Sequence, residues 1–153
     1  MKIGGLVEQG NLVIYTVTSL SDQPGVAAQL LTILALAQIN LEFITEISYR
    51  DNSAVMSFCI DADKMDAADK IIHENVEAKA LKISKIEYVS ILGIYGPHFR
   101  EKPGIAAAFC SVLGEAGINI LGISSSISTF SCIIDVRDIE KAKKLLLSKF
   151  ELP

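Results

Sequence analysis

The chain has 153 residues, of which 50% are hydrophobic and 21% are charged, a composition typical of a globular protein that buries a substantial core. Its 14 basic and 18 acidic residues give a formal net charge of -4 and provide no cationic face for nucleic acid or anionic lipid. The N-terminus lacks a basic and then apolar signal segment, and every apolar stretch is too short to span a membrane, so we expect a cytoplasmic protein that binds neither nucleic acid nor membrane.

The first half of the chain predicts a sheet covered by two helices. Residues 12–18 (LVIYTVT) are rich in β-branched residues and predict a strand, whereas residues 24–38 predict a helix, because Pro24 suits a first helical turn. By residue number, the expected order is strand 12–18, helix 24–38, strands 41–49 and 54–60, helix 65–75 and strand 81–86. This βαββαβ order is the ferredoxin-like motif.

The second half repeats the first. The segment DQPGVAAQLLTILALAQINLEFI at residues 22–44 aligns without a gap with EKPGIAAAFCSVLGEAGINILGI at residues 101–123. The shared positions include a Pro-Gly pair and an Ile-Asn pair, so the chain is a duplicated unit. The expected elements of this copy are strand 89–95, helix 103–115, strands 119–128 and 130–136, and helix 138–149.

The second copy lacks a closing strand, since only residues 150–153 follow its last helix, and a sheet edge would be left unpaired. Residues 2–7 form a spare strand that the first copy does not need. We therefore expect the leading strand to complete the second sheet, giving an α+β protein with two ferredoxin-like units. The units are residues 12–86 and residues 1–11 with 87–153, interlocked so that they unfold together.

The sequence offers no constellation for catalysis or metal binding. The glycines of MKIGG follow no strand and precede no GK[ST], the two histidines lack partners at metal-ligand spacing, and the serine-rich stretch 124–131 has no GxSxG elbow. Cys59, Cys110 and Cys132 lie in apolar contexts without CxxC spacing, which predicts reduced, buried thiols. We expect no catalytic residue, no metal and no cofactor.

The repeated turn before each long helix is the candidate binding site. Gln23 is a poor cap for the first helix, and the lysine at the matching place in the second copy is a worse one. The amides of Val26 and Ala27, with the helix dipole, are then available to an α-carboxylate, and Gly25 lets a ligand approach the backbone. Asp22 is placed to accept from an α-ammonium group, so a free amino acid fits both halves. The alternative is an ordinary turn into a helix.

Three motifs make the chain resemble the tandem ACT regulatory region of aspartate kinases: the turn DQPGVAA, the pair AQINL and AGINI, and the ending INILGISSSISTFSCIIDVRDIEKAKKLLLSKFEL. The resemblance covers residues 3–152 and implies the βαββαβ fold, with the leading strand lent to the second unit. It also implies a regulatory role without a kinase domain in this sequence, as a separately made regulatory subunit, a fragment of a longer kinase or a stand-alone relative.

The resemblance further implies that lysine, threonine or a similar amino acid binds between ACT units paired across a homodimer and shifts a kinase catalytic subunit toward an inactive arrangement. The first implied effector site comprises Asp22, Gly25, Val26, Ala27, Glu46, Asn119 and Ile120, and the second comprises Asn40, Leu41, Glu101, Gly104, Ala106, Ser124, Ser125 and Ser126.

Two residues depart from the family pattern. Glu46 replaces a glutamine and adds a negative charge to the first site, and Ile127 replaces a glutamate that would pair with a lysine ammonium in the second. An assembly role without a ligand is the alternative function, and these two departures favour it. The first long helix is apolar on most sides, which predicts that a second chain covers it in either case.

Overall fold

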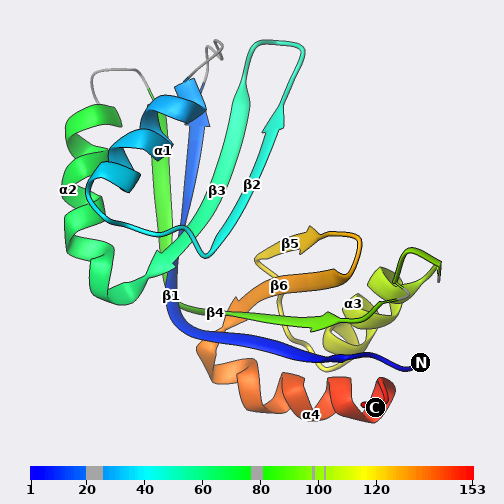
Figure 1. Ribbon diagram of the computed structural model, residues 1–153. Helices are drawn as coiled ribbons and strands as arrows, with labels where there is room; N and C mark the ends of the chain where they lie inside the picture. Colours follow the sequence, from blue (N-terminus) through cyan, green and yellow to red (C-terminus); the bar gives the residue numbers. More distant parts are fainter. Residues whose placement is uncertain (20–25, 77–80, 98, 102) are drawn as a thin grey trace. The chain divides into compact units, whose positions relative to one another are not determined.

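Two long strands, β1 (Gly5–Ser19) and β4 (Leu81–Tyr95), each contribute to both halves of the molecule. The computed structural model, drawn in Figure 1, describes the chain except residues 20–25, 77–80, 98 and 102, and it describes only the backbone of residues 26, 27, 76, 81 and 100. The chain forms two compact units. We call Leu12–Glu87 the central unit, and Met1–Asn11 together with Tyr88–Pro153 the terminal unit.

The central unit is a sheet in the order β2-β3-β1-β4 with two helices on one face (Figure 1). β3 pairs antiparallel with both β2 and β1, and Tyr15 lies opposite Phe58. The further elements of this unit are α1 (Val26–Leu36), β2 (Phe43–Ser48), β3 (Ala54–Asp61), the 3-10 turn η1 (Ala62–Lys64) and α2 (Met65–Val76).

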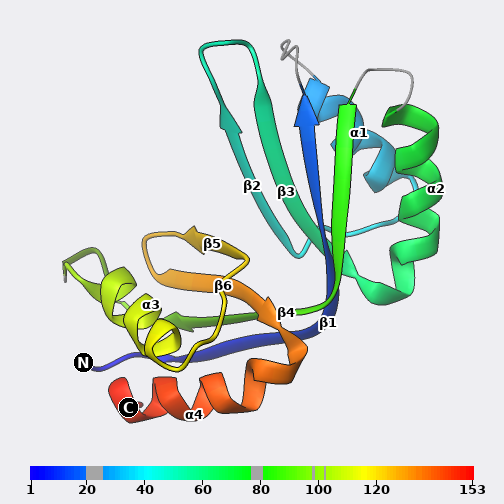
Figure 2. The ribbon, with the colours of Figure 1, turned by 180° about the vertical axis from the view of Figure 1, so that it is seen from behind.

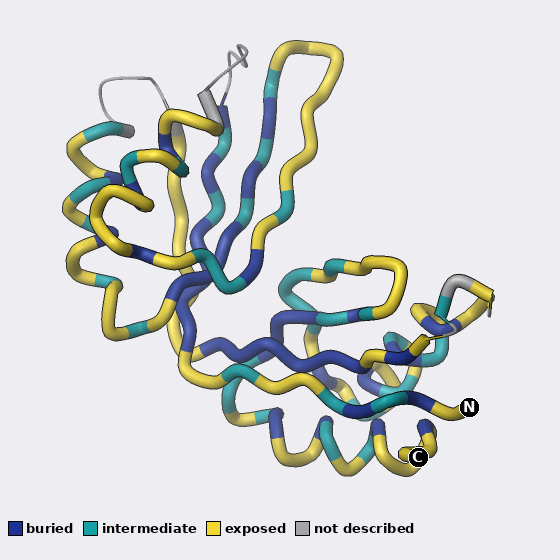
Figure 3. The backbone as a smooth tube through the Cα atoms, in the orientation of Figure 1, coloured by how far each residue is buried: buried dark blue, intermediate teal, exposed yellow. Residues whose placement is uncertain are grey.

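The core of the central unit lies between the sheet and the two helices, because alternate strand residues meet helix residues spaced three or four apart. Tyr15 and Phe58 stack there with ring centroids 5.4 Å apart. The hairpin that joins β2 to β3 is exposed (Figure 3). The buried core residues of this unit are Val13, Tyr15, Val17, Leu30, Leu34, Ile39, Met56, Phe58, Ile60, Ala68 and Ile72.

The terminal unit repeats this plan with strands in the order β1-β4-β6-β5, so that the N-terminal strand completes its sheet. The two chain ends lie side by side (Figure 2), where Lys2 bridges to Glu151. The further elements of this unit are the 3-10 turn η3 (Phe99–Glu101), α3 (Ile105–Glu115), β5 (Gly122–Ser125), β6 (Thr129–Asp135), the 3-10 turn η4 (Val136–Asp138) and α4 (Ile139–Lys149).

Aromatic residues from α3, from β6 and from the end of α4 pack in the core of the terminal unit. Phe109 and Phe130 pack with ring centroids 4.8 Å apart. Phe150, directly after α4, is 1% exposed. The buried core residues are Ile3, Leu92, Ile94, Ile105, Phe109, Leu113, Ile118, Phe130, Cys132, Ile134, Ile139, Ala142, Leu146 and Phe150.

The predicted fold class is confirmed, since both units have the sheet order of a ferredoxin-like fold. The central unit has the βαββαβ chain order, and in the terminal unit β1 takes the place of the last strand. Several element boundaries were wrong. The separate strands expected at residues 81–86 and 89–95 are one strand, β4, and the leading strand runs on into the next as β1. Each strand is continuous through its junction, although the burial pattern of its side chains changes there. The strand expected over residues 119–128 is only Gly122–Ser125.

The cysteine prediction was right for two residues and wrong for one. Cys59 and Cys132 are fully buried, and burial raises the pKa of each thiol to about 12. Cys110 is only partly buried, because its position on α3 lies between the core face and the outer face of the helix. All three are free thiols.

The glycines of the MKIGG segment serve packing against Tyr95. A Cβ on Gly4 would lie 2.9 Å from the Tyr95 ring, and a Cβ on Gly5 would lie 2.7 Å from the Tyr95 hydroxyl. The Gly4 amide also donates to the Tyr95 carbonyl at 2.6 Å. These two glycines therefore let the leading strand approach β4 closely.

Within the described residues, no helix combines the length and apolar character that a membrane span requires. The same residues contain no group of three or more histidine, cysteine, aspartate or glutamate side chains placed to hold a metal ion.

Candidate effector site

The start of α3 carries no side-chain cap among the described residues. Gly104 stands at the cap position with a left-handed φ of 95°, and a glycine has no side chain that could cap the helix. The first helical hydrogen bond runs from the Ala108 amide to the Gly104 carbonyl at 2.9 Å. The amides of the first helical turn have no partner within the helix, so they and the helix dipole favour an anion. The helix begins at Ile105, not at Pro103 as expected, because a left-handed residue cannot continue it backward.

A cavity of about 240 Å³ opens beside this helix start. Its polar wall is the end of β5 and the turn into β6, where the Ser126 amide donates to the Thr129 carbonyl at 2.8 Å. The Thr129 amide donates to Ser126 Oγ at 3.2 Å, which fixes the turn. The residues that line the cavity are Phe99, Gly104, Ile105, Ala106, Ser125, Ser126, Thr129 and Phe130.

The cavity brings together four residues of the second predicted site: Gly104, Ala106, Ser125 and Ser126. Sequence reasoning missed its other lining residues. Phe130 belongs to the core, whereas Phe99 lies in η3 and Thr129 is the first residue of β6. No motif was used to identify these positions from the sequence. The TF pair that follows the serine run was the available signal.

The remaining residues predicted for the second site lie elsewhere. Ser124 is paired with Ser131 and points to the sheet face opposite to that of Ser125, because neighbouring strand residues alternate. Glu101 ends η3 and is exposed. Asn40 and Leu41 belong to the central unit, where Asn40 is exposed and Leu41 packs against the core.

The first predicted site is only partly described. Asp22 and Gly25 lie outside the described residues, and Val26 and Ala27 are the first two residues of α1, with side chains outside the description. The two residues assigned to this site from the other unit follow α3: Asn119 is exposed, and Ile120 packs against the terminal core.

Glu46 has the place in the central unit that Ser125 has in the terminal unit. Glu46 lies opposite Met56 on β3, and Ser125 lies opposite Phe130 on β6. Met56 and Phe130 are core residues of their units, so both Glu46 and Ser125 lie on the helix-facing side of an edge strand. Because Ser125 lines the cavity, this correspondence associates Glu46 with the helix start of its own unit.

Comparison with known proteins agrees with this duplicated architecture. The chain matches the ACT domain family twice, over residues 18–76 and 92–150. Aspartate kinase of Pseudomonas fluorescens is 30% identical over 141 residues, which make up 90% of this chain and 33% of that kinase. The chain thus spans about a third of the length of the curated relatives that it matches.

Two crystal structures share the fold over nearly the whole chain. A structure of aspartokinase alpha and beta subunits is 27% identical, with a TM-score of 0.86 and coverage of 96% of this chain and 97% of that chain. The ligand-free regulatory subunit of aspartate kinase from Thermus thermophilus is 20% identical, with a TM-score of 0.88 and coverage of 99% and 100%. The chain therefore belongs to the ACT domain family, as a tandem pair of ACT domains that aligns with about a third of the length of aspartate kinases.

Proposed function

We propose that this chain senses a free amino acid and passes the signal to an aspartate kinase catalytic subunit. One observation carries the proposal: α3 begins without a side-chain cap and opens onto a cavity lined by serine and threonine hydroxyls. The amides of the first helical turn would bind the α-carboxylate, and Ser125, Ser126 and Thr129 would accept from the α-ammonium group.

A second effector position at the start of α1 is part of the same proposal. Its residues would be Asp22, Gly25, Val26, Ala27 and Glu46, with Asn119 and Ile120. The carboxylate of Glu46 favours an effector with a basic side chain such as lysine. Ile127 supplies no such partner near the α3 cavity, so a small hydroxylic effector such as threonine suits that cavity better.

The proposed assembly is a homodimer. In the central unit, Leu36 on α1 is 79% exposed, and Ile47 and Tyr49 are 60% and 53% exposed at the β2 edge. Leu36 lies on the helix side of the unit, whereas Ile47 and Tyr49 lie on the open face of the sheet, because strand residues alternate. Exposed apolar side chains of this kind are what a second copy would cover. Within the cytoplasm, an effector that binds only one dimer arrangement would stabilise it, and such coupling typically amounts to about 1–3 kcal/mol.

A thermal-shift screen of the full chain against the proteinogenic amino acids tests the proposal. A bound effector must raise the melting temperature by mass action. Ala106→Leu places a larger side chain in the α3 cavity and should remove the part of the shift that this cavity contributes, whereas Ala107→Leu, on the same helix but outside that cavity, should keep the full shift. Asp22→Ala tests the α1 position in the same way. Silence across all amino acids would contradict the sensor role and support an assembly role.

A further inference from the structure

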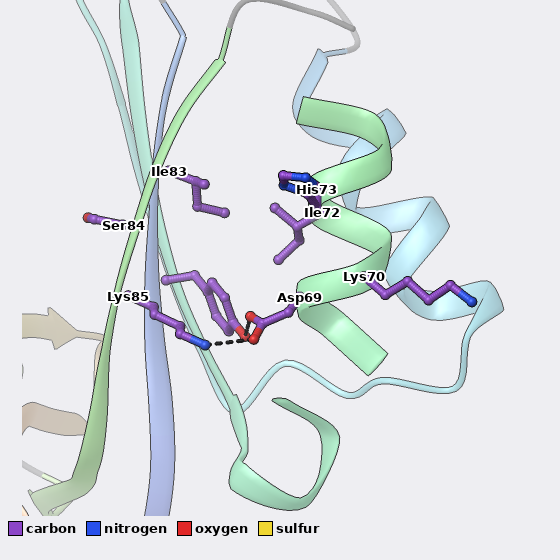
Figure 4. Close-up of a pocket in the computed structure, with 8 residues that line it drawn as sticks. Asp69, Lys70, Ile72, His73, Ile83, Ser84 and Lys85 are labelled. Atoms are coloured by element: carbon purple, nitrogen blue, oxygen red, sulfur yellow. Dashed lines mark hydrogen bonds and ion pairs between the residues drawn. The ribbon is translucent and has the colours of Figure 1, made fainter. Parts of the chain in front are cut away.

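A second and larger cavity, of about 520 Å³, lies in the central unit between α2 and β4. Figure 4 shows Ile72 and His73 on α2 facing Ile83 on β4, with Asp69 and Lys85 together at one end. Ile72 is buried and Ile83 is 38% exposed, so the middle of the cavity is apolar and open to solvent on one side. Its size and mostly apolar lining are those of a small-molecule site.

The polar end of this cavity is a fixed network. The Tyr15 hydroxyl donates to Asp69 Oδ1 at 2.6 Å, and Lys85 Nζ donates to Asp69 Oδ2 at 2.6 Å. Tyr15 is 1% exposed and stacks on Phe58, so its ring is a rigid wall. Both oxygens of Asp69 are thus engaged by the protein, whereas this bond uses one of the three N–H donors of Lys85.

The corresponding seam of the terminal unit lies between α4 and β1. There Leu6 of β1 packs against the core, and Phe150 follows α4 with 1% exposure. The corresponding strand residue of the central unit, Ile83, stands outside the core cluster. The strand residue at this place is thus packed in the terminal unit and exposed in the central unit.

We propose that the α2–β4 cavity binds a small carboxylate with an apolar body. The carboxylate accepts from Lys85 Nζ, and the apolar body lies against Ile72, Ile83 and the Tyr15 ring. A free amino acid suits this cavity less well, because its ammonium group would compete with Lys85 and the Tyr15 hydroxyl for Asp69, the one carboxylate among the described lining residues. The ligand class thus differs from that of the α3 cavity, and the inference does not rest on the proposed function.

The test follows the isoleucine methyl signals of the full chain by NMR during titration with 3-phenylpropionate. We expect saturable shifts at Ile72 and Ile83. The neutral 3-phenylpropanamide lacks the charge and should bind about ten-fold more weakly, and so should phenylalanine, which adds the ammonium group. Equal binding of the acid and the amide would overturn the proposal, as would saturable shifts confined to Ile105 and Ile123 of the terminal unit.

Variants of the cavity residues sharpen the test. Lys85→Met keeps the apolar stem and should weaken 3-phenylpropionate binding about ten-fold, to the level of the amide. Ile83→Trp should fill the cavity and abolish binding, and Leu147→Trp, on the second helix of the terminal unit, is its matched control. Unchanged binding in Lys85→Met contradicts the proposal even if Ile83→Trp fails to fold. An amino-acid thermal shift that persists in Lys85→Met shows that the two cavities are independent.

Discussion

In each unit an ion pair joins the second helix to the strand that completes the sheet, and the two ion pairs have reversed polarity. In the central unit Asp69, the fifth residue of α2, pairs with Lys85 of β4 at 2.6 Å. In the terminal unit Lys143, the fifth residue of α4, pairs with Glu8 of β1 at 2.8 Å. A helix that met the wrong strand would place like charges together. In an interlocked duplicate, this reversal discriminates between two strands that the repeated fold would otherwise accept equally.

A second difference lies beneath the ion pair. Tyr15 is opposite Phe58 in the central sheet, and the terminal sheet has Leu92 opposite Cys132 at the equivalent place. The Asp69–Lys85 ion pair of the central unit is therefore anchored by the buried Tyr15 hydroxyl, whereas the ion pair of the terminal unit lies over an apolar core. Asp69 thus has two partners, the buried Tyr15 hydroxyl and Lys85 of β4. Lys143 bridges only the surface carboxylates of Glu8 and Glu140.

The largest effects should come from emptying each core in turn. Phe58 and Phe109 are fully buried in the central and terminal units, so Phe58→Ala and Phe109→Ala should each lower the free energy of unfolding by about 3–5 kcal/mol. Because β1 and β4 run through both units, we expect a single transition in each variant, measured by calorimetry and circular dichroism.

The control for this prediction is Leu152→Ala, since Leu152 is 50% exposed and should change stability little. Two separate transitions, of which only the one from the mutated unit shifts, would show that the units fold independently. In that case the reversed ion pairs would not be needed to direct each helix to its own strand.

The next effect should distinguish the two ion pairs. Asp69→Ala leaves the buried Tyr15 hydroxyl with only the Met65 carbonyl at 3.4 Å, so we expect a loss of about 1–3 kcal/mol. Lys143→Ala exposes no buried polar group and should cost clearly less. Chemical denaturation of both variants measures the difference. Tyr15→Phe added to Asp69→Ala should recover part of the loss, and an equal cost for the two single variants would contradict the comparison.

The pH dependence of stability should further distinguish the helix–strand contact of the central unit from that of the terminal unit. Burial, with a hydrogen bond to the Asp69 carboxylate, raises the pKa of Tyr15 above its ordinary value. An unfolded tyrosine ionises near pH ~10, so the stability contributed by the neutral Tyr15 is complete below that pH and is lost as the pH rises above it. We expect the melting temperature to fall above pH ~10 and Tyr15→Phe to reduce this fall. If the melting temperature of Tyr15→Phe falls at high pH as much as that of the unmodified chain, this prediction is wrong.

The loss of stability at low pH should depend on Asp69. Partial burial raises the pKa of this carboxyl, but hydrogen bonds from Lys85 and Tyr15 outweigh burial and hold the pKa below its ordinary value. Its contribution is therefore present above pH ~4 and is lost as the pH falls below that range. The melting temperature of Asp69→Asn should show less acid dependence than that of the unmodified chain.

The fold could be predicted from the sequence because its signals are local and repeated. The Pro-Gly and Ile-Asn pairs mark helix starts and ends in both copies, and alternating apolar residues mark the strands. The continuity of β1 and β4 could not be predicted, because the side-chain pattern changes at the unit boundary although the strand does not end there.

The sites show the same division. Gly104 and Ala106 were found because the repeated turn identifies a helix start, whereas Phe99 and Thr129 were missed. The α2–β4 cavity was also missed, since its network joins Asp69 to Tyr15 and Lys85 across sequence separations of 54 and 16 residues. No spacing rule predicts contacts of that range without the fold.

The smallest effect concerns the two residues at which the chain passes from one unit to the other. Asn11 and Tyr88 both have left-handed backbones, with φ values of 48° and 58°. A left-handed conformation costs most residues about 1–2 kcal/mol, whereas asparagine tolerates it. Since Tyr88 is 65% exposed, Tyr88→Asn should raise the melting temperature, by a gain of up to about 1 kcal/mol, and Asn11→Tyr should lower it. If Tyr88→Asn is destabilising in a melting experiment, the Tyr88 ring makes contacts whose loss outweighs backbone strain, and the two crossing points are not equivalent.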